Sequence, residues 1–279
     1  MVTVLRPLSI SELLDRTFHL YRNNFVVFAG IAALPQLVVL ALQLAFSGLI
    51  FAGALSSVGG ALAAGVGVSL IIGIASYIAV ETSHAATVMA VSHLHLDRPT
   101  SIGLAYASAK SSIGRVIGIS FVIALACGVG FLFLVVPGVY LALTWSLAIP
   151  VTVLEGGGMG ASTTRSGLLT KGSKGRIFVI YLLILVLAWI VSALFQLVLV
   201  GSLKVVTIND ASTRSAISYA LQSAAGFIST CLVGPLATIA GTLIYYDQRV
   251  RKEGFDLQLM MATIEGGGQG AQIAATTQP

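Results

Sequence analysis

The run Ile177–Val200, IFVIYLLILVLAWIVSALFQLVLV, contains no charged residue over its whole length. A helix needs about 20 apolar residues to cross the hydrocarbon core of a bilayer, so this stretch predicts a membrane span. Five other stretches have a similar character. The six predicted spans are approximately Phe25–Leu49, Ala61–Ala90, Val116–Val136, Val139–Leu154, Ile177–Val200 and Ala216–Tyr246. The sequence therefore predicts an all-α, polytopic membrane bundle of six transmembrane helices.

The composition of the chain agrees with this class. Of the 279 residues, 57% are hydrophobic and only 9% are charged, and the mean hydropathy is +0.98. A soluble domain carries about 25% charged residues, which form its hydrated surface. The composition thus excludes an ordinary soluble enzyme, a disordered protein and a disulfide-rich secreted module. Cys127 and Cys231 lie inside apolar runs, where we expect them to pack rather than to form a disulfide or bind a metal.

The basic residues lie almost entirely on one side of the predicted spans. That face holds 13 of the 15 Lys and Arg residues, and the other face holds Lys204 and Arg214. Basic residues collect on the cytoplasmic side of membrane proteins, so both termini are predicted to be cytoplasmic. The net charge of +5 has the same explanation, and we expect no nucleic-acid partner.

The cytoplasmic segments contain helix signals of their own. Ser9 and Glu12 have the spacing of a capping box, and an amphipathic pattern follows, which predicts an interfacial helix over 9–24. The pattern of Arg6–Ile10 recurs at Arg98–Ile102 and predicts a second surface helix before the third span. Val136-Pro137-Gly138 predicts a tight turn after that span. We expect a single membrane domain over 1–260 and a disordered tail over 261–279.

Glu81 and His84 are the candidate intramembrane polar site. They lie three residues apart, on one face of the predicted second span, where ionisable groups are rare. A proton relay, a metal site and an axial ligand to a tetrapyrrole are the functional alternatives. In the structural alternative, the side chains of Thr82, Ser83 and His84 form hydrogen bonds with one another and with the backbone. The chain has no second Glu-x-x-His motif, and we expect no metal and no cofactor.

A glycine-rich basic segment follows the fourth predicted span. Contact with anionic lipid headgroups would explain it, and so would the general bias of basic residues to the cytoplasmic face. The candidate headgroup contacts are Arg165, Lys171, Lys174 and Arg176.

The C-terminal motif is predicted to be structural. Asp247 and Arg251, like Arg249 and Glu253, are four residues apart and can pair along a helix. Tyr246 suits the headgroup level, and Gly254 is placed to end the helix. We further hypothesise that Asp247 or an arginine contacts the 9–24 helix, with Arg16 or Arg22 as the partner of Asp247.

Three stretches together resemble a known family. The first stretch is Leu8–Leu34, which contains the motifs Ser11–Phe18 and Leu20–Phe25. The second begins with Val136–Tyr140 and continues through Trp145, Pro150 and Val153–Glu155 to Arg165-Ser166. The third is Leu243–Leu257. They resemble the bacterial membrane-domain family that is named after the N-terminal membrane part of glycerophosphoryl diester phosphodiesterases. The likeness covers roughly Leu5 to Leu259.

The resemblance implies a multi-pass protein of the bacterial plasma membrane. In the fused members of that family, catalysis belongs to a separate soluble barrel, so the resemblance implies no enzyme activity here and transfers no catalytic residue. The leading interpretation is a non-enzymatic scaffold or accessory subunit that organises lipids or other membrane-protein subunits. The alternative is a small-solute or lipid transporter with a polar site near Glu81 and His84. A transporter should have a polar cavity near the middle of the bilayer, whereas a scaffold should be packed there.

The predicted orientation can be tested by cysteine labelling. Single cysteines at Ser57, Ala211 or Ser173 would be introduced after Cys127 and Cys231 are replaced by alanine. A membrane-impermeant maleimide should label positions 57 and 211 in intact cells, and position 173 only after permeabilisation. The opposite pattern would mean that the basic face is not cytoplasmic.

Overall fold

The computed structural model describes residues 8–51, 58–201 and 211–254, and this part of the chain is helical almost throughout. The tail predicted at 261–279 lies outside the described residues, as do Arg6, Ser57 and Lys204. The helices are α1 (Ile10–Asn23), α2 (Phe25–Phe51), α3 (Val58–His95), α4 (Ile102–Phe133), α5 (Val135–Thr144), α6 (Ala148–Glu155), α7 (Met159–Thr170), α8 (Lys174–Gly201) and α9 (Ala211–Glu253).

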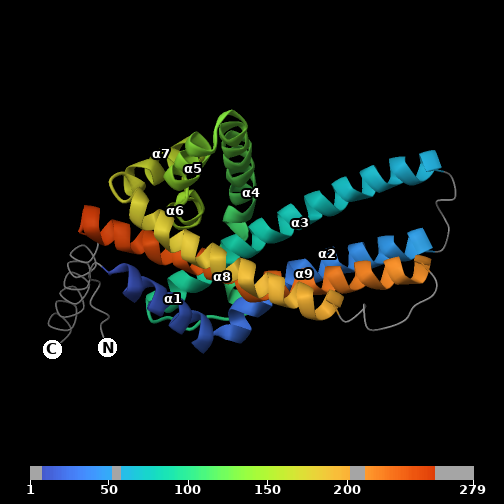
Figure 1. Ribbon diagram of the computed structural model, residues 1–279. Coiled ribbons are helices and arrows are strands. Elements are labelled where there is room, and N and C mark those ends of the chain that lie inside the picture. Colours follow the sequence, from blue (N-terminus) through green and yellow to red (C-terminus); the bar gives the residue numbers. More distant parts are fainter. Residues whose placement is uncertain (1–7, 52–57, 202–210, 255–279) are drawn as a thin grey trace, which may run out of the picture.

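Six stretches of the described residues are long and apolar enough to cross a membrane, which confirms the predicted class. They are Phe25–Gly48, Gly65–His95, Ile102–Phe133, Val135–Glu155, Lys174–Leu199 and Ile217–Glu253. The last of them is the centre of the bundle, because 61% of its 18-residue apolar stretch is buried inside the protein. The corresponding share in the other five spans is 11% to 33%. Figure 1 shows α9 beside α2 and α8, while α4 leaves in another direction with α5, α6 and α7 beside it.

Helix α1 forms where the capping signal places it. The backbone N–H of Ser9 donates to Glu12 Oε2 over 2.7 Å, and Ser9 Oγ accepts from the Glu12 N–H over 3.2 Å. Asn24 alone separates α1 from α2, and its N–H still donates to the Leu20 carbonyl. Leu13 and Thr17 are buried, and α1 lies against the C-terminal end of α9. We call the end of the molecule that contains α1, α7 and the last turns of α9 the base (Figure 1).

The second predicted surface helix is not separate. Ser101 caps a helix, accepting from the Leu104 N–H over 3.3 Å, but that helix runs without interruption into the third span as α4. Ala105, Ala109 and Val116 are all buried, so one face continues from the cap into the membrane. The prediction of two helices was wrong because no proline interrupts this segment and its small residues pack against the bundle.

The fourth span is broken, which the sequence prediction missed. Helix α5 ends at Thr144 and α6 begins at Ala148, with Pro150 in the first turn of α6, where its missing N–H costs least. Backbone groups freed by the break must find partners inside a membrane, and α7 supplies them. Ser166 Oγ accepts from the Leu147 N–H over 3.2 Å and donates to the Thr144 carbonyl over 2.8 Å.

The turn between α4 and α5 also differs in position. It lies at Leu134, which has an extended backbone, and not at Val136-Pro137-Gly138. Pro137 instead occupies the first turn of α5, where a proline is tolerated. The two helices then approach closely, because a Cβ added to Gly130 would lie 3.0 Å from Gly138 Cα.

Hydroxyl groups from two other helices compensate for the hydrogen bond that a proline removes from α2. Pro35 has no N–H to donate to the carbonyl four residues earlier, which is that of Ile31. The Tyr106 hydroxyl from α4 donates to this carbonyl over 2.6 Å, and Ser83 Oγ from α3 lies 3.4 Å from it. This bond joins α2 to α4 at a place where helix geometry alone would leave an unpaired acceptor.

Replacing Tyr106 with phenylalanine should destabilise the protein by about 1–2 kcal/mol, because a buried carbonyl loses its main partner. In a Pro35→Ala background the same change should cost less, because the alanine N–H can then bond to Ile31. Thermal unfolding of the four proteins in one detergent measures this double-mutant cycle. Equal losses in both backgrounds would contradict the assigned role of Tyr106.

Candidate functional site

A cavity of about 430 Å³ lies between α2, α3, α8 and α9. Four glutamines from three helices line it, together with hydroxyl groups of Ser76, Tyr219, Ser223 and Thr230. The glutamines are Gln36, Gln43, Gln196 and Gln222. We call this space the glutamine cavity. Its volume lies within the range of about 300–1,000 Å³ that is usual for ligand pockets.

The glutamine cavity extends from the middle of the membrane-spanning helices toward the end that lies away from the base. Gln36 follows the start of its span by 11 residues, which is about 16 Å along the helix. Gln196 lies three residues before the end of its span at Leu199, and Gln222 lies five residues after the start of its span at Ile217. Gln36 is buried, whereas Gln196 and Gln222 are exposed, so the cavity is a cleft with Gln36 at its floor. Among the described residues, none that lines it is formally charged, and its glutamine amides make no hydrogen bond to protein.

His84 lies beneath the floor of this cavity, with Glu81 beside it. Gln36 and Thr230 also line a cavity of about 30 Å³, which His84 lines too. His84 Nδ1 lies 3.4 Å from Glu81 Oε2. The same carboxylate oxygen accepts a hydrogen bond from Ser120 Oγ on α4 over 2.8 Å. The two predicted residues are thus together, and the described part of the chain brings no third His, Cys, Asp or Glu to them.

The hydroxyl groups beside His84 have other partners. Thr82 Oγ1 donates to the Ile78 carbonyl over 2.6 Å, and Ser83 Oγ donates to the Ala79 carbonyl over 2.9 Å. Neither bonds to His84, so the mutual satisfaction of Thr82, Ser83 and His84 is not the arrangement here. The threonine and serine bond to their own helix, and His84 is left facing Glu81.

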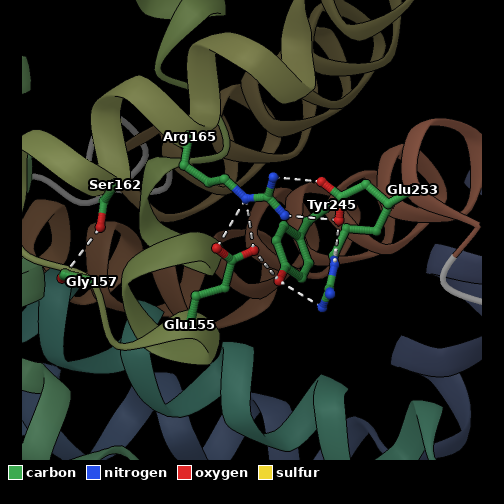
Figure 2. Close-up of polar contacts among 7 residues, drawn as sticks. Glu155, Gly157, Ser162, Arg165, Tyr245 and Glu253 are labelled. Carbon is green, nitrogen blue, oxygen red and sulfur yellow. Dashed lines mark hydrogen bonds and ion pairs between the residues drawn. The ribbon is translucent and has the colours of Figure 1, made fainter. Parts of the chain in front are cut away.

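Arg165 joins three helices at the base (Figure 2). Its Nε donates to Glu155 Oε2 over 3.0 Å, and its Nη1 lies 2.5 Å from Glu253 Oε1. The Tyr245 hydroxyl donates to Glu155 Oε1 over 2.8 Å, and Arg249 Nε donates to Glu253 over 3.1 Å. The hydrogen bond to Glu253 and that to Glu155 raise the pKa of Arg165 above its ordinary value. The cluster therefore ties the α6–α7 segment to the end of α9.

Asp247 forms a second cluster on another side of α9. Its side chain is completely buried, and Oδ2 accepts from Arg176 Nη1 over 2.6 Å and from Arg251 Nε over 3.0 Å. Its Oδ1 accepts from the Leu8 N–H over 2.8 Å, and both arginines donate to the Leu8 carbonyl over 2.6 Å. Asp247 thus reaches the residue that precedes the cap of α1.

The predicted arginine partners of Asp247 were wrong. Arg16 Nη2 instead lies 3.4 Å from His95 Nδ1, and Arg22 is exposed. A spacing of four residues predicts ion pairs along one helix, such as Asp247 with Arg251. Arg176 lies on α8, so only the packing of α8 against α9 brings it to Asp247.

The remaining predicted residues have separate positions. Lys174 Nζ lies 3.3 Å from the centre of the Tyr140 ring, and Lys171 is exposed. With Arg165 and Arg176 in ion pairs, the four candidate headgroup contacts do not form one free basic patch. The Tyr246 hydroxyl is 2.9 Å from Ser92 Oγ, so this ring is buried between helices. Gly254 follows α9 with a φ of 59°, a left-handed conformation that favours glycine.

The glutamine cavity was missed from the sequence, although a signal existed. Gln36, Gln43, Gln196 and Gln222 each lie within a long apolar helix, where an amide that faces lipid is unfavourable. Periodicity on single helices could not show that the four point into one space.

No family model, curated protein or solved structure matches the chain. The family resemblance of the sequence therefore stays a prediction.

Replacing Asp247 with asparagine should lower stability by about 3–5 kcal/mol, because it leaves the positive charge of Arg176 partly buried without its carboxylate. Thermal or denaturant unfolding in detergent measures the loss. Asp15→Asn, the same change on the exposed face of α1, is the control and should alter stability by less than about 0.5 kcal/mol. Equal effects would show that the Asp247 cluster does not hold the base together.

Proposed function

We propose that this chain is a non-enzymatic multi-pass protein of the bacterial plasma membrane that binds a small polar solute in the glutamine cavity and moves it across the bilayer. The observation that supports this function is the convergence of four amides from α2, α8 and α9 on one intramembrane cleft. A protein that only organises partners has no need of four amides in one cleft between its spans, where polar groups are costly unless they are satisfied. The cleft therefore favours a transporter over the scaffold, which is the leading interpretation of the sequence.

The lining of the cleft indicates the chemical class of the solute. Amides and hydroxyls supply both donors and acceptors, and the described lining residues supply no charge to pair with an ion. We therefore propose an uncharged, polyhydroxylated solute the size of a mono- or disaccharide. The solute site is the glutamine cavity itself, next to Glu81 and His84 rather than on them.

A scaffold or accessory subunit is the second candidate, and the base supports it. The two ion-pair clusters fix α1, α7 and α8 around α9, which would give membrane partners a rigid cytoplasmic surface. Arg22, Arg98, Lys110 and Lys171 are exposed on this side and have no ion pair within the described residues. Under either function we propose that these residues, more than Arg165 and Arg176, contact anionic lipid headgroups.

Solute binding can be tested with the purified full chain in detergent. Glycerol, glucose and sucrose are the uncharged probes, and phosphate and glutamate are the charged ones. At least one uncharged probe should raise the unfolding temperature in a saturable manner, and the charged probes should not. Gln196→Leu and Gln222→Leu nearly preserve side-chain volume and should weaken binding about 3- to 10-fold each, as expected for the loss of one neutral hydrogen bond.

The matched control is Leu197→Ala, next to Gln196 on α8 but 71% exposed. It should leave the affinity unchanged. If no uncharged probe stabilises the protein, or if the glutamine variants bind as well as the control, the proposed solute site is wrong. The scaffold would then be the better supported function.

A further inference from the structure

The turn between α4 and α5 ends in an exposed apolar tip. Five consecutive side chains there are 66% to 86% exposed, namely Leu132, Phe133, Leu134, Val135 and Val136. The segment 121–143, which we call the arm, contains no Lys, Arg, Asp or Glu. A contiguous apolar surface of this kind is unfavourable in water and marks a place of contact with lipid or with protein.

Helix α5 is too short to carry the arm back across a bilayer. It has 10 residues and is therefore about 15 Å long, whereas the hydrocarbon core is about 30 Å thick. The helix ends at the base, because the carbonyl of Thr144 accepts from Ser166 Oγ of α7 over 2.8 Å. The tip therefore lies within about half a bilayer of the base.

Lys174 fixes the level of the arm more closely. It is the first residue of α8, and the long uncharged stretch of that helix begins after Arg176, so this turn lies at the membrane boundary on the side of the base. Lys174 Nζ is 3.3 Å from the centre of the Tyr140 ring. Leu134 precedes Tyr140 by six residues, which is about 9 Å along α5. The tip thus lies in the half of the bilayer that borders the base.

Helix α4 approaches the tip from the same side. Near its start, Tyr106 donates to the Ile31 carbonyl, which Ser83 of α3 also approaches, and further along Ser120 donates to Glu81 of α3. The contact advances 14 residues along α4, about 21 Å, but only 2 residues along α3, about 3 Å. Helix α4 therefore crosses α3 steeply, and Figure 1 shows it leaving the bundle sideways.

The backbone of the turn suits an apolar environment. Leu134 is the one residue between α4 and α5, and its N–H donates to the Gly130 carbonyl over 3.1 Å. Its own carbonyl accepts from the Gly138 N–H over 3.5 Å, and Pro137 has no N–H that needs a partner. Backbone groups within lipid must be paired inside the protein, and this turn meets much of that need with a single extended residue.

We infer that the arm is a re-entrant hairpin, which enters the bilayer from the side of the base, contacts the acyl chains of that leaflet with its tip and returns to the same side. Of the described helices, α2, α3, α8 and α9 cross the bilayer, whereas α4 and α5 reach into one leaflet. The partner of the tip is lipid, since its side chains are all aliphatic or aromatic and its neighbour Lys174 marks the headgroup level. Lys110, exposed on α4 before the arm, suits anionic headgroups of the same leaflet.

Pairs of cysteines test the level of α5 in native membranes. In the background without native cysteines, a short bis-maleimide should join Tyr140→Cys to Lys174→Cys, because α5 returns to the start of α8. The matched control is Tyr140→Cys with Thr213→Cys, near the start of α9, and this pair should not be joined. A hairpin that crosses the bilayer would hold position 140 near the opposite surface, so failure of the first pair or joining of the second overturns the inference.

A nitroxide at Leu134→Cys tests the contact with lipid, in liposomes of phosphatidylcholine and phosphatidylglycerol. It should collide often with oxygen, which dissolves in hydrocarbon, and rarely with a water-soluble nickel chelate. The matched control is Leu185→Cys, which is 64% exposed in the middle of α8 and should behave in the same way. Lys171→Cys and Thr213→Cys, beyond the two ends of the spans, should show the reverse preference.

Each other outcome contradicts the inference. Collision with the nickel chelate at position 134, to the extent seen at position 171 or 213, would place the tip in water and overturn the re-entrant hairpin. Rare collision with both reagents would mean that protein, such as a second copy of the chain, covers the tip, and would overturn the contact with lipid. Neither measurement uses a solute, so failure of the sugar probes would overturn the proposed function and leave this inference standing.

Discussion

The carboxylate of Asp247 is the interaction on which the arrangement of the base depends. It lies on the central helix and is fully buried, and it binds the backbone before α1 and the first turn of α8 at the same time. These segments are separated by more than 160 residues along the chain, yet one side chain and the Leu8 peptide group bring them together. The two arginines that neutralise Asp247 also satisfy the Leu8 carbonyl, so charge and backbone are paired in one network. Such a network is costly to leave half satisfied, which makes the position of α1 well defined.

The same rule, that polar groups inside a membrane need partners, explains the irregular features of the spans. The carbonyl of Ile31, freed by Pro35, is bonded by Tyr106, and the break between α5 and α6 is bonded by Ser166. Both of these irregularities are answered by a hydroxyl group from another helix. The glutamine cavity differs, because its amides have no hydrogen-bond partner among the described residues. The carbonyls at the breaks have hydroxyl partners and these amides do not, which is the physical basis for the proposal that the cavity binds a ligand.

Much of the fold could be predicted from the sequence, since the length and apolarity of each span are local properties. The capping box at Ser9, the ion pairs in the last turns of α9 and the stop at Gly254 were predictable for the same reason. The break at residues 145–147 was not, because a short helix containing proline has the same composition whether it is straight or broken. The Arg176–Asp247 pair and the glutamine cavity depend on which helices become neighbours, and periodicity within one helix contains no such information.

Helix α9 contributes residues to the glutamine cavity, to the space beside His84 and to the base. Its residues from Tyr219 to Thr230 line the glutamine cavity, Thr238 and Gly241 lie at His84, and Asp247 and Glu253 anchor the base. Pro235 lies between the cavity and the anchor and lines the small space beside His84. A helix bends with least cost at a proline, since one backbone hydrogen bond is already absent there. Pro235 thus places the position of least bending cost between the part of α9 that lines the cavity and the part that the ion pairs of the base hold.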